Sequence, residues 1–157
     1  MVRLEPMTEE EFDGYLRYSN EEYAKEKVRA GTWKEEEALR LSEESFQSLL
    51  PDGLATPKAL LYRIVDGESG EKVGHYWLHE MDSPAGKTLY IYDFLIETPF
   101  QGQGYGKAAM AALDVKAKEL GAAQLSLHVF GHNTRAFRLY EKSGFHVTDY
   151  MMSKPLA

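Results

Sequence analysis

Polar and hydrophobic positions in the first third of the chain follow helical rules. Thr8 and Glu11, three positions apart, form a capping box, which marks the start of a helix. We expect this helix to end near Ala30, because Gly31 is a typical residue just beyond a helix terminus. A short strand over Val2–Pro6 would precede it.

A second capping box predicts a second helix. Thr32 and Glu35 would cap it, and Pro51 with the residues after it would end it near Leu50. Four apolar residues should form one buried stripe along this helix: Leu39, Phe46, Leu49 and Leu50.

After the second predicted helix, the spacing of hydrophobic positions shortens from the helical period to the two-residue period of strands. We expect a hairpin of Ala59–Val65 and Lys72–His79, joined by a turn at 66–70. A loop over Met81–Lys87 leads into a third strand, Thr88–Ile96. Its almost continuous apolar and aromatic sequence is typical of a strand covered on both faces.

The last third alternates between helix and strand. Four apolar residues at helical spacing predict a helix that ends near Gly121: Met110, Leu113, Ala117 and Leu120. A strand over Gln124–Phe130, a short helix over Asn133–Lys142 and one or two strands within Phe145–Leu156 should follow. The chain therefore predicts one α/β domain over residues 1–157, with a mixed sheet of six to seven strands and about four helices on both faces.

Composition narrows the class of protein. The chain has 157 residues, 43% of them hydrophobic and 27% charged, as in an ordinary globular domain. It has no cysteine, which excludes disulfides and a thiol nucleophile. The N-terminus has no signal pattern and no apolar run reaches membrane-spanning length, so we expect a cytoplasmic protein.

The net charge is −7, from 25 acidic and 18 basic residues. A negative field repels nucleic acid and favours a cationic partner such as an amine, although the same charge also serves solubility. We therefore expect neither nucleic acid nor a membrane as a partner.

A glycine-rich turn is the most informative local motif. It reads Gln101, Gly102, Gln103, Gly104, Tyr105 and Gly106. Placed between a strand and a helix, it would aim several backbone N–H groups and the positive end of the helix dipole at one anion, such as a pyrophosphate. A plain tight turn is the simpler alternative. A dinucleotide site is disfavoured, because the spacing is not Gly-x-Gly-x-x-Gly and the next strand ends without an acid.

A second motif lies about thirty residues further on. Asn133, Ala136 and Tyr140 fall at i, i+3 and i+7, on one face of the short helix. The glycine turn and this motif, in this order, resemble the Gcn5-related N-acetyltransferase (GNAT) superfamily.

The resemblance implies acetyl-CoA as cosubstrate and a central pair of parallel strands, 88–96 and 124–130, that splay apart. The pantetheine arm would pair with the backbone of Leu95 and Ile96, and the pyrophosphate would lie on residues 101–106.

Roles for the second motif also follow from the resemblance. Asn133 would contact the cofactor arm and Ala136 would leave room for it. Tyr140 would be the general acid for the departing thiolate, a task that suits a phenol because it is protonated at pH 7. The alternatives are that Asn133 only caps its helix and that Tyr140 is a core aromatic.

The general base is left open. Tyr90 stands where some members of the superfamily carry a Glu, which removes the simplest base. His128 stands where others carry an acid, and an imidazole can serve as a base. Asp93, which strand alternation places on the face opposite Tyr90, Tyr92 and Phe94, would bind an ammonium or pair with a buried donor. The remaining candidates are Glu97 and water.

Four histidines show no metal-ligand pattern, so we expect no metal: His75, His79, His128 and His132. By the resemblance, the first two helices and the loop after Trp77–His79 would form the acceptor wall. Four aromatic residues there could contact a cation: Tyr15, Tyr18, Tyr23 and Trp33.

The predicted function is acetyl transfer from acetyl-CoA to a primary amine, directly in a ternary complex. The acceptor would be a small-molecule or peptide amine, and members of the superfamily often form homodimers. A non-catalytic sensor that only binds acyl-CoA is the alternative from another class.

Overall fold

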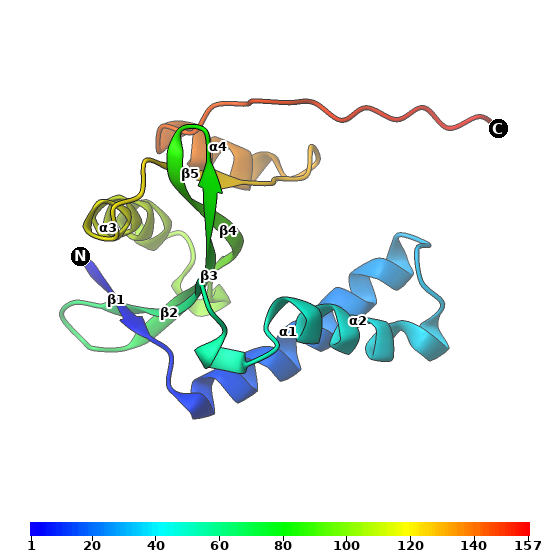
Figure 1. The fold of residues 1–157 in the computed structure, drawn as a ribbon, viewed down its shortest axis with the longest axis horizontal. Coiled ribbons are helices and arrows are strands. Elements are labelled where there is room, and N and C mark those ends of the chain that lie inside the picture. The colour runs from blue at the N-terminus through cyan, green and yellow to red at the C-terminus, as the bar shows by residue number, and fades with distance from the viewer.

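A five-stranded sheet forms the centre of the structure, a computed structural model that describes residues 1–157 (Figure 1). The strands lie side by side in chain order: β1 (Val2–Pro6), β2 (Ala59–Asp66), β3 (Lys72–Ser83), β4 (Gly86–Ile96) and β5 (Gln124–Leu127). The first four pair antiparallel, and β4 pairs parallel with β5. The predicted α/β class and mixed sheet are confirmed.

Four α-helices accompany the sheet, as the sequence predicts: α1 (Glu9–Arg29), α2 (Glu35–Leu49), α3 (Tyr105–Glu119) and α4 (Thr134–Lys142). Helices α1 and α2 pack against each other on one side, and α3 lies on the other side, against β1 and β4 (Figure 1). No helix combines the length and the apolar composition that crossing a membrane requires.

Two hydrophobic clusters lie on opposite faces of the sheet. On the α3 face, Tyr76 and Leu78 of β3 pack with Leu113 of α3. On the α1 face, Trp77 of β3 packs with Phe12 of α1. Successive residues of β3 therefore belong to different clusters, so both faces of this strand are buried.

One extra residue in β4 changes which of its side chains share a face. Trp77 pairs with Asp93 and Leu78 pairs with Ile91, so Tyr92 has no partner across the ladder. This β-bulge shifts the alternation by one position. Tyr92 and Asp93 consequently share the α1 face, and the Tyr92 ring stacks on Trp77 at 4.8 Å.

The expected orientation of Asp93 is thereby corrected. Regular alternation placed it opposite Tyr90, Tyr92 and Phe94. Tyr90 contacts Tyr92 at 4.9 Å, so both rings lie on the face that carries Asp93. Only Phe94 lies on the other face, where it stacks on Tyr76 at 4.8 Å.

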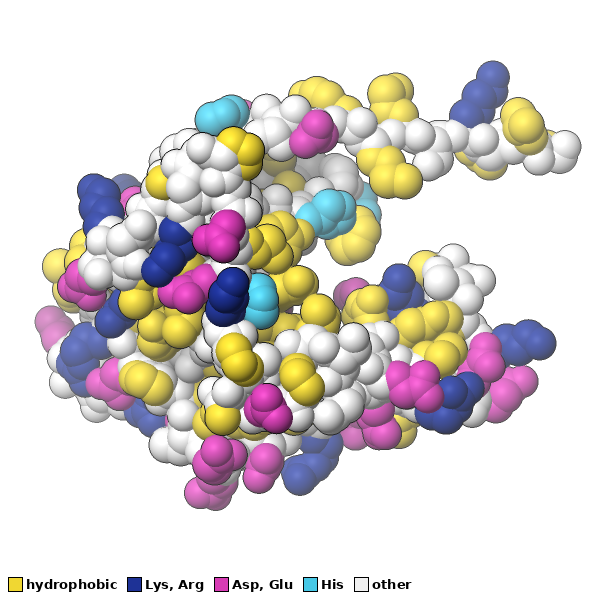
Figure 2. All heavy atoms as spheres, in the orientation of Figure 1, with side chains coloured by type: hydrophobic (Ala, Val, Ile, Leu, Met, Phe, Trp, Pro, Cys, Tyr) yellow, Lys and Arg dark blue, Asp and Glu magenta, His cyan; other side chains and the backbone are white.

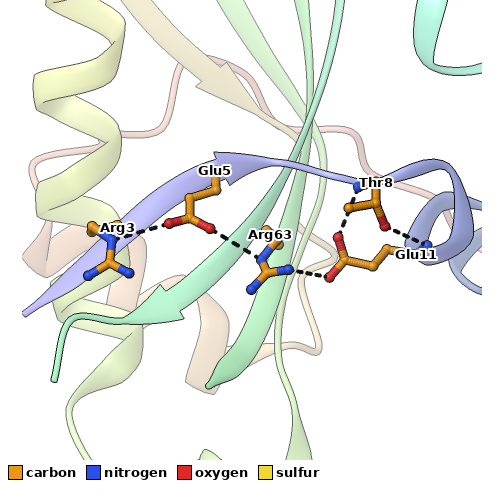
Figure 3. A network of polar contacts seen from close by, with 5 residues as sticks. All are labelled: Arg3, Glu5, Thr8, Glu11 and Arg63. Carbon is orange, nitrogen blue, oxygen red and sulfur yellow. Dashed lines mark hydrogen bonds and ion pairs between the residues drawn. The ribbon is translucent and has the colours of Figure 1, made fainter. Parts of the chain in front are cut away.

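Helix α1 is tied to the sheet at its first turn (Figure 3). The predicted capping box is present: Thr8 accepts from the backbone of Glu11, and the Glu11 carboxylate accepts from the backbone of Thr8. The other Glu11 oxygen lies 3.0 Å from Arg63 of β2, which also pairs with Glu5 of β1 at 3.5 Å. Arg3 pairs with Glu5 at 3.2 Å. Charges on three elements thus hold the start of α1 in place.

The second helix departs from its prediction at its start and along its buried face. Its N-cap is Lys34, with no side-chain cap, so the expected capping box at Thr32 is wrong. Leu39 and Leu49 are exposed, and the fully buried residues are Ala38 and Ser42. Small side chains allow close approach to α1, where the Ser42 hydroxyl donates to the carbonyl of Asn20 at 2.9 Å.

The hairpin of β3 and β4 is longer than predicted. Both strands extend into the expected 81–87 loop, pairing as far as Ser83 and Gly86. Strand β5 is shorter than predicted and ends at Leu127.

The predicted strands within Phe145–Leu156 are absent, so the sheet has five strands rather than six to seven. This segment leaves α4 as an extended chain and runs away from the sheet (Figure 1). It therefore never reaches the free edge of β5, and an alternating sequence forms a strand only where a partner edge is within reach. Its side chains are largely exposed, Tyr150 at 84% and Met151 at 97%.

The parallel pair, β4 and β5, consequently lies at the edge of the sheet, so its predicted central position is wrong. Pairing begins at Thr88 with Gln124 and ends at Ile91 with Leu127. Strand β4 then continues to Ile96 with β3 on one side only.

Gly74 of β3 allows β4 to lie close at this unpaired end. A Cβ at residue 74 would overlap the carbonyl oxygen of Leu95. Since a backbone atom would have to move, we expect Gly74→Ala to lower the free energy of unfolding by about 2 kcal/mol or more. Urea denaturation measures this change.

Gly14→Ala is the matched control, because nothing lies within 4 Å of the Cβ that it adds to α1. It should raise the free energy of unfolding by up to about 1 kcal/mol. Equal stability of Gly74→Ala and the wild type would contradict the close approach.

Candidate active site

The glycine turn is the N-terminal end of α3. Gly104 is the N-cap residue, with φ at 86°, and Gly102 has φ at 77°. Side-chain-bearing residues rarely adopt this left-handed conformation. A Cβ at either position would meet nothing within 4 Å, so the space in front of the turn is open.

Backbone N–H groups face this space without protein partners. Residues 102–107 donate no backbone hydrogen bond to any protein acceptor, and the first such bond in the helix runs from Ala108 to Gly104. No side chain caps this helix terminus. The partial positive charge of α3 is thus uncompensated, and the turn has the donors that a pyrophosphate requires.

Side chains of the turn stabilise its shape. Gln101 donates to the carbonyl of Ile96 at 2.8 Å, and Gln103 donates to the carbonyl of Pro99 at 3.0 Å. The Tyr105 hydroxyl donates to Asp66, the last residue of β2. These side chains hold the loop, while its backbone stays available to a ligand.

The predicted pantetheine residues lie just before this turn. Leu95 and Ile96 end β4, past the point where β5 stops pairing with it. One edge of β4 is therefore free of a neighbouring strand at this end. An extended chain with amide groups can add to such an edge, and the pantetheine role of the two residues stays a prediction.

Helix α4 carries the second motif. Asn133 is its N-cap and accepts from the backbone of Ala136 at 3.3 Å, so the capping role is present. A Cβ at Gly106 would lie 3.3 Å from the Leu139 side chain, which shows that α3 and α4 contact each other beside Tyr140.

Tyr140 is half-buried and its hydroxyl makes no hydrogen bond within the protein. Burial raises its pKa, and the negative charge of Asp93 raises the same pKa further. The phenol therefore keeps its proton at neutral pH and is available as a donor.

Figure 2 shows a hollow between two sides of the molecule. One side is formed by α4 and the C-terminal segment, and the other by α1 and α2. Hydrophobic side chains line much of its inner surface.

The predicted bases differ in their surroundings. His128 follows β5, is exposed and contacts Phe130 ring to ring at 4.9 Å, with no hydrogen bond to Tyr140 or Asp93. Glu97 pairs with Lys72 at 3.5 Å, away from the other candidates.

Asp93, by contrast, has two donors on one carboxylate oxygen. The Tyr15 hydroxyl of α1 donates to Oδ2 at 2.7 Å, and His75 Nε2 of β3 lies 3.1 Å from the same atom. Tyr15 and His75 are buried and in edge contact at 4.6 Å, while the Asp93 side chain is 40% exposed. Burial, and then the charge of Asp93, raise the pKa of Tyr15 well above its ordinary value, so it stays a donor.

The expected pairing of Asp93 with a buried donor is confirmed, but the two donors were not identified from the sequence. They lie 78 and 18 positions from Asp93 along the chain, and no local spacing connects them. The only signal was a carboxylate in an apolar strand.

The expected cation-binding aromatics are divided between different roles. Tyr15 is buried against His75. Tyr23 and Trp33 already have a cation of the protein itself, since Lys27 Nζ lies 5.4 and 5.7 Å from their ring centres. Tyr18 is 53% exposed.

Comparisons with known proteins agree on one family. A family model described as "Acetyltransferase (GNAT) family" matches residues 13–145. The uncharacterized N-acetyltransferases YycN and YdgE of Bacillus subtilis are 46% and 38% identical to the chain. The alignments span 99% of both chains for YycN, and 98% of this chain and 97% of YdgE. The crystal structure of Bacillus subtilis YycN superposes with a TM-score of 0.89 at 47% identity, covering 100% of this chain and 99% of that one.

The influence of Asp93 on Tyr140 can be measured directly. Asp93→Asn removes a negative charge that disfavours the phenolate, so the Tyr140 pKa should fall. It should stay above the ordinary value of about 10, because burial is the larger cause. NMR titration of ring-labelled tyrosine, assigned with Tyr140→Phe, gives both values. An unchanged Tyr140 pKa would show that the two groups do not face each other.

Proposed function

This chain belongs to the acetyltransferase (GNAT) family and is an N-acetyltransferase, and we propose that it transfers the acetyl group of acetyl-CoA directly to a primary amine in a ternary complex. Family membership implies the use of acetyl-CoA.

One observation carries the proposal: the N–H groups of residues 102–107 have no acceptor in the protein. The first N–H groups of a helix have no partner within the helix and are satisfied by side-chain caps, water or a ligand, and no side chain caps them in α3. Here they converge on open space at the start of α3, beside the unpaired end of β4. A pyrophosphate would accept from these N–H groups, and the amides of the pantetheine arm would pair along Leu95 and Ile96.

Tyr140 has the properties of the general acid. Its hydroxyl has no partner in the protein, its raised pKa keeps it protonated, and α4 meets α3 beside it. In the proposed transfer, the amine attacks the thioester carbonyl and backbone N–H groups stabilise the oxyanion. Tyr140 then protonates the departing thiolate. The absence of cysteine excludes an acyl-cysteine intermediate.

Cofactor binding is tested by a pair of glycine variants on one helix. Gly104→Val places a side chain in front of the free N–H groups, so it should weaken acetyl-CoA binding at least about tenfold in calorimetric titration. Gly121→Val imposes similar strain beyond the opposite end of α3, with φ at 77° and open space around the Cβ. It should bind like the wild type. Equal losses in both variants would refute a site at the turn.

The general acid is tested by Tyr140→Phe, with Tyr150→Phe as a control on the 84% exposed Tyr150 of the C-terminal segment. Thiol release is followed with 2-phenylethylamine, spermidine, kanamycin and a lysine peptide as acceptors. We expect kcat for Tyr140→Phe to fall about 100-fold or more, with little change in the KM for acetyl-CoA. Wild-type kcat in this variant would remove Tyr140 from the reaction.

A further inference from the structure

The α1 face of the sheet holds a carboxylate arranged to meet a cation. Oδ2 of Asp93 accepts from Tyr15 at 2.7 Å and from His75 at 3.1 Å, and these bonds fix the side chain. Neither bond uses Oδ1. Because the Asp93 side chain is 40% exposed, the carboxylate keeps a free oxygen while its other oxygen is held.

The surroundings of Asp93 are aromatic. Tyr92, 36% exposed, stacks on Trp77 at 4.8 Å and contacts the edge of Tyr90. Phe46 of α2 lies behind Trp77 at 5.7 Å. By alternation, the other carboxylates of β3 and β4, Glu80 and Asp82, lie on the opposite face. One negative charge thus stands beside a row of flat apolar rings.

Resting on the proposed function, we propose that Asp93 receives the acceptor nitrogen, and that the acceptor is a primary monoamine with an aromatic or similarly flat apolar body. The amine would meet Oδ1, and its carbon body would pack on Tyr92. A polyamine or an aminoglycoside offers several charges, whereas this face of the two strands offers a single carboxylate. Tyr15 and His75 are positioning residues, which act by holding Asp93.

The chemistry balances with Asp93 as proton acceptor. The ammonium bound at Asp93 first loses one proton to solvent. The resulting neutral amine nitrogen forms a bond to the thioester carbonyl carbon and becomes cationic in the adduct. It gives its proton to Oδ1 of Asp93, the C–S bond breaks, and the thiolate takes the proton of Tyr140. Solvent then removes the proton from Asp93 and restores that of Tyr140. His128, which is exposed and unbonded, has no part in these steps.

The test compares kcat/KM for 2-phenylethylamine and spermidine, with acetyl-CoA binding measured on the same samples. We expect the wild type to prefer 2-phenylethylamine at least about tenfold, the effect of one well-placed contact. Asp93→Asn should lower kcat/KM for 2-phenylethylamine at least about 100-fold, while the Kd for acetyl-CoA stays at the wild-type value. Asp82→Asn, at an exposed carboxylate near the far end of β3, should match the wild type.

Tyr15→Phe tests the positioning role, because it keeps the buried ring and removes only the donor. It should lower kcat about tenfold and leave the KM for acetyl-CoA unchanged.

Three other results would each contradict a different part of the proposal: the role of Asp93, the acceptor class or the proposed function. Full activity of Asp93→Asn, or a loss confined to His128→Ala, would overturn the role of Asp93. Preference for spermidine or kanamycin over 2-phenylethylamine would overturn the acceptor class alone. Tight acetyl-CoA binding with no amine acetylated would overturn the proposed function itself.

Discussion

The bulge at Tyr92 is the constraint on which the arrangement of this protein depends. Before the bulge, the side chains of Leu89 and Ile91 lie on the α3 face of the sheet. After the bulge, those of Phe94 and Ile96 lie on the same face. With a regular ladder, one of these pairs would have to leave the core, or Asp93 would enter it. An unpaired carboxylate among apolar side chains is costly. The extra residue lets one strand fill a core on one face and present Tyr92 with Asp93 on the other.

A second chain of contacts sets the position of α1 relative to that strand. Glu11 both caps the helix and pairs with Arg63, so the helix begins at a fixed place over β2. Tyr15 is one turn further along the same helix and donates to Asp93 of β4. The ion pair is partly shielded from solvent, with 25% and 20% of its two side chains exposed. Interactions at the helix start thus determine the geometry at Asp93 of β4, which lies 78 residues after Tyr15 in the chain.

Most features that depend on near neighbours could be predicted from the sequence, although the equally local capping box at Thr32 is absent. The Thr8 capping box, the glycine turn and the Asn133 cap each lie within a few residues, and all three are present. Features that depend on distant partners could not. A single-residue bulge has no spacing signal of its own, so alternation misplaced Asp93, and the partners Tyr15 and His75 were not identified. In α2, close packing by Ala38 and Ser42 overrode the larger Leu39. The segment after α4 has a strand-like sequence, yet pairing needs an edge that it does not reach.

The two sides of the hollow come from different parts of the chain. Helix α4 and the C-terminal segment belong to residues 134–157, whereas α1 and α2 on the other side belong to residues 9–49. Strand β4 carries residues of both predicted ligand surfaces. Leu95 and Ile96, for the cofactor, lie at its end, and Tyr92 and Asp93, for the acceptor, lie nearer its middle. Substitutions in α1 and α2 can therefore alter one ligand surface without touching the other. Such a division makes the N-terminal helix pair a natural target for protein engineering, and a region where paralogues can diverge while the anion-binding turn stays unchanged.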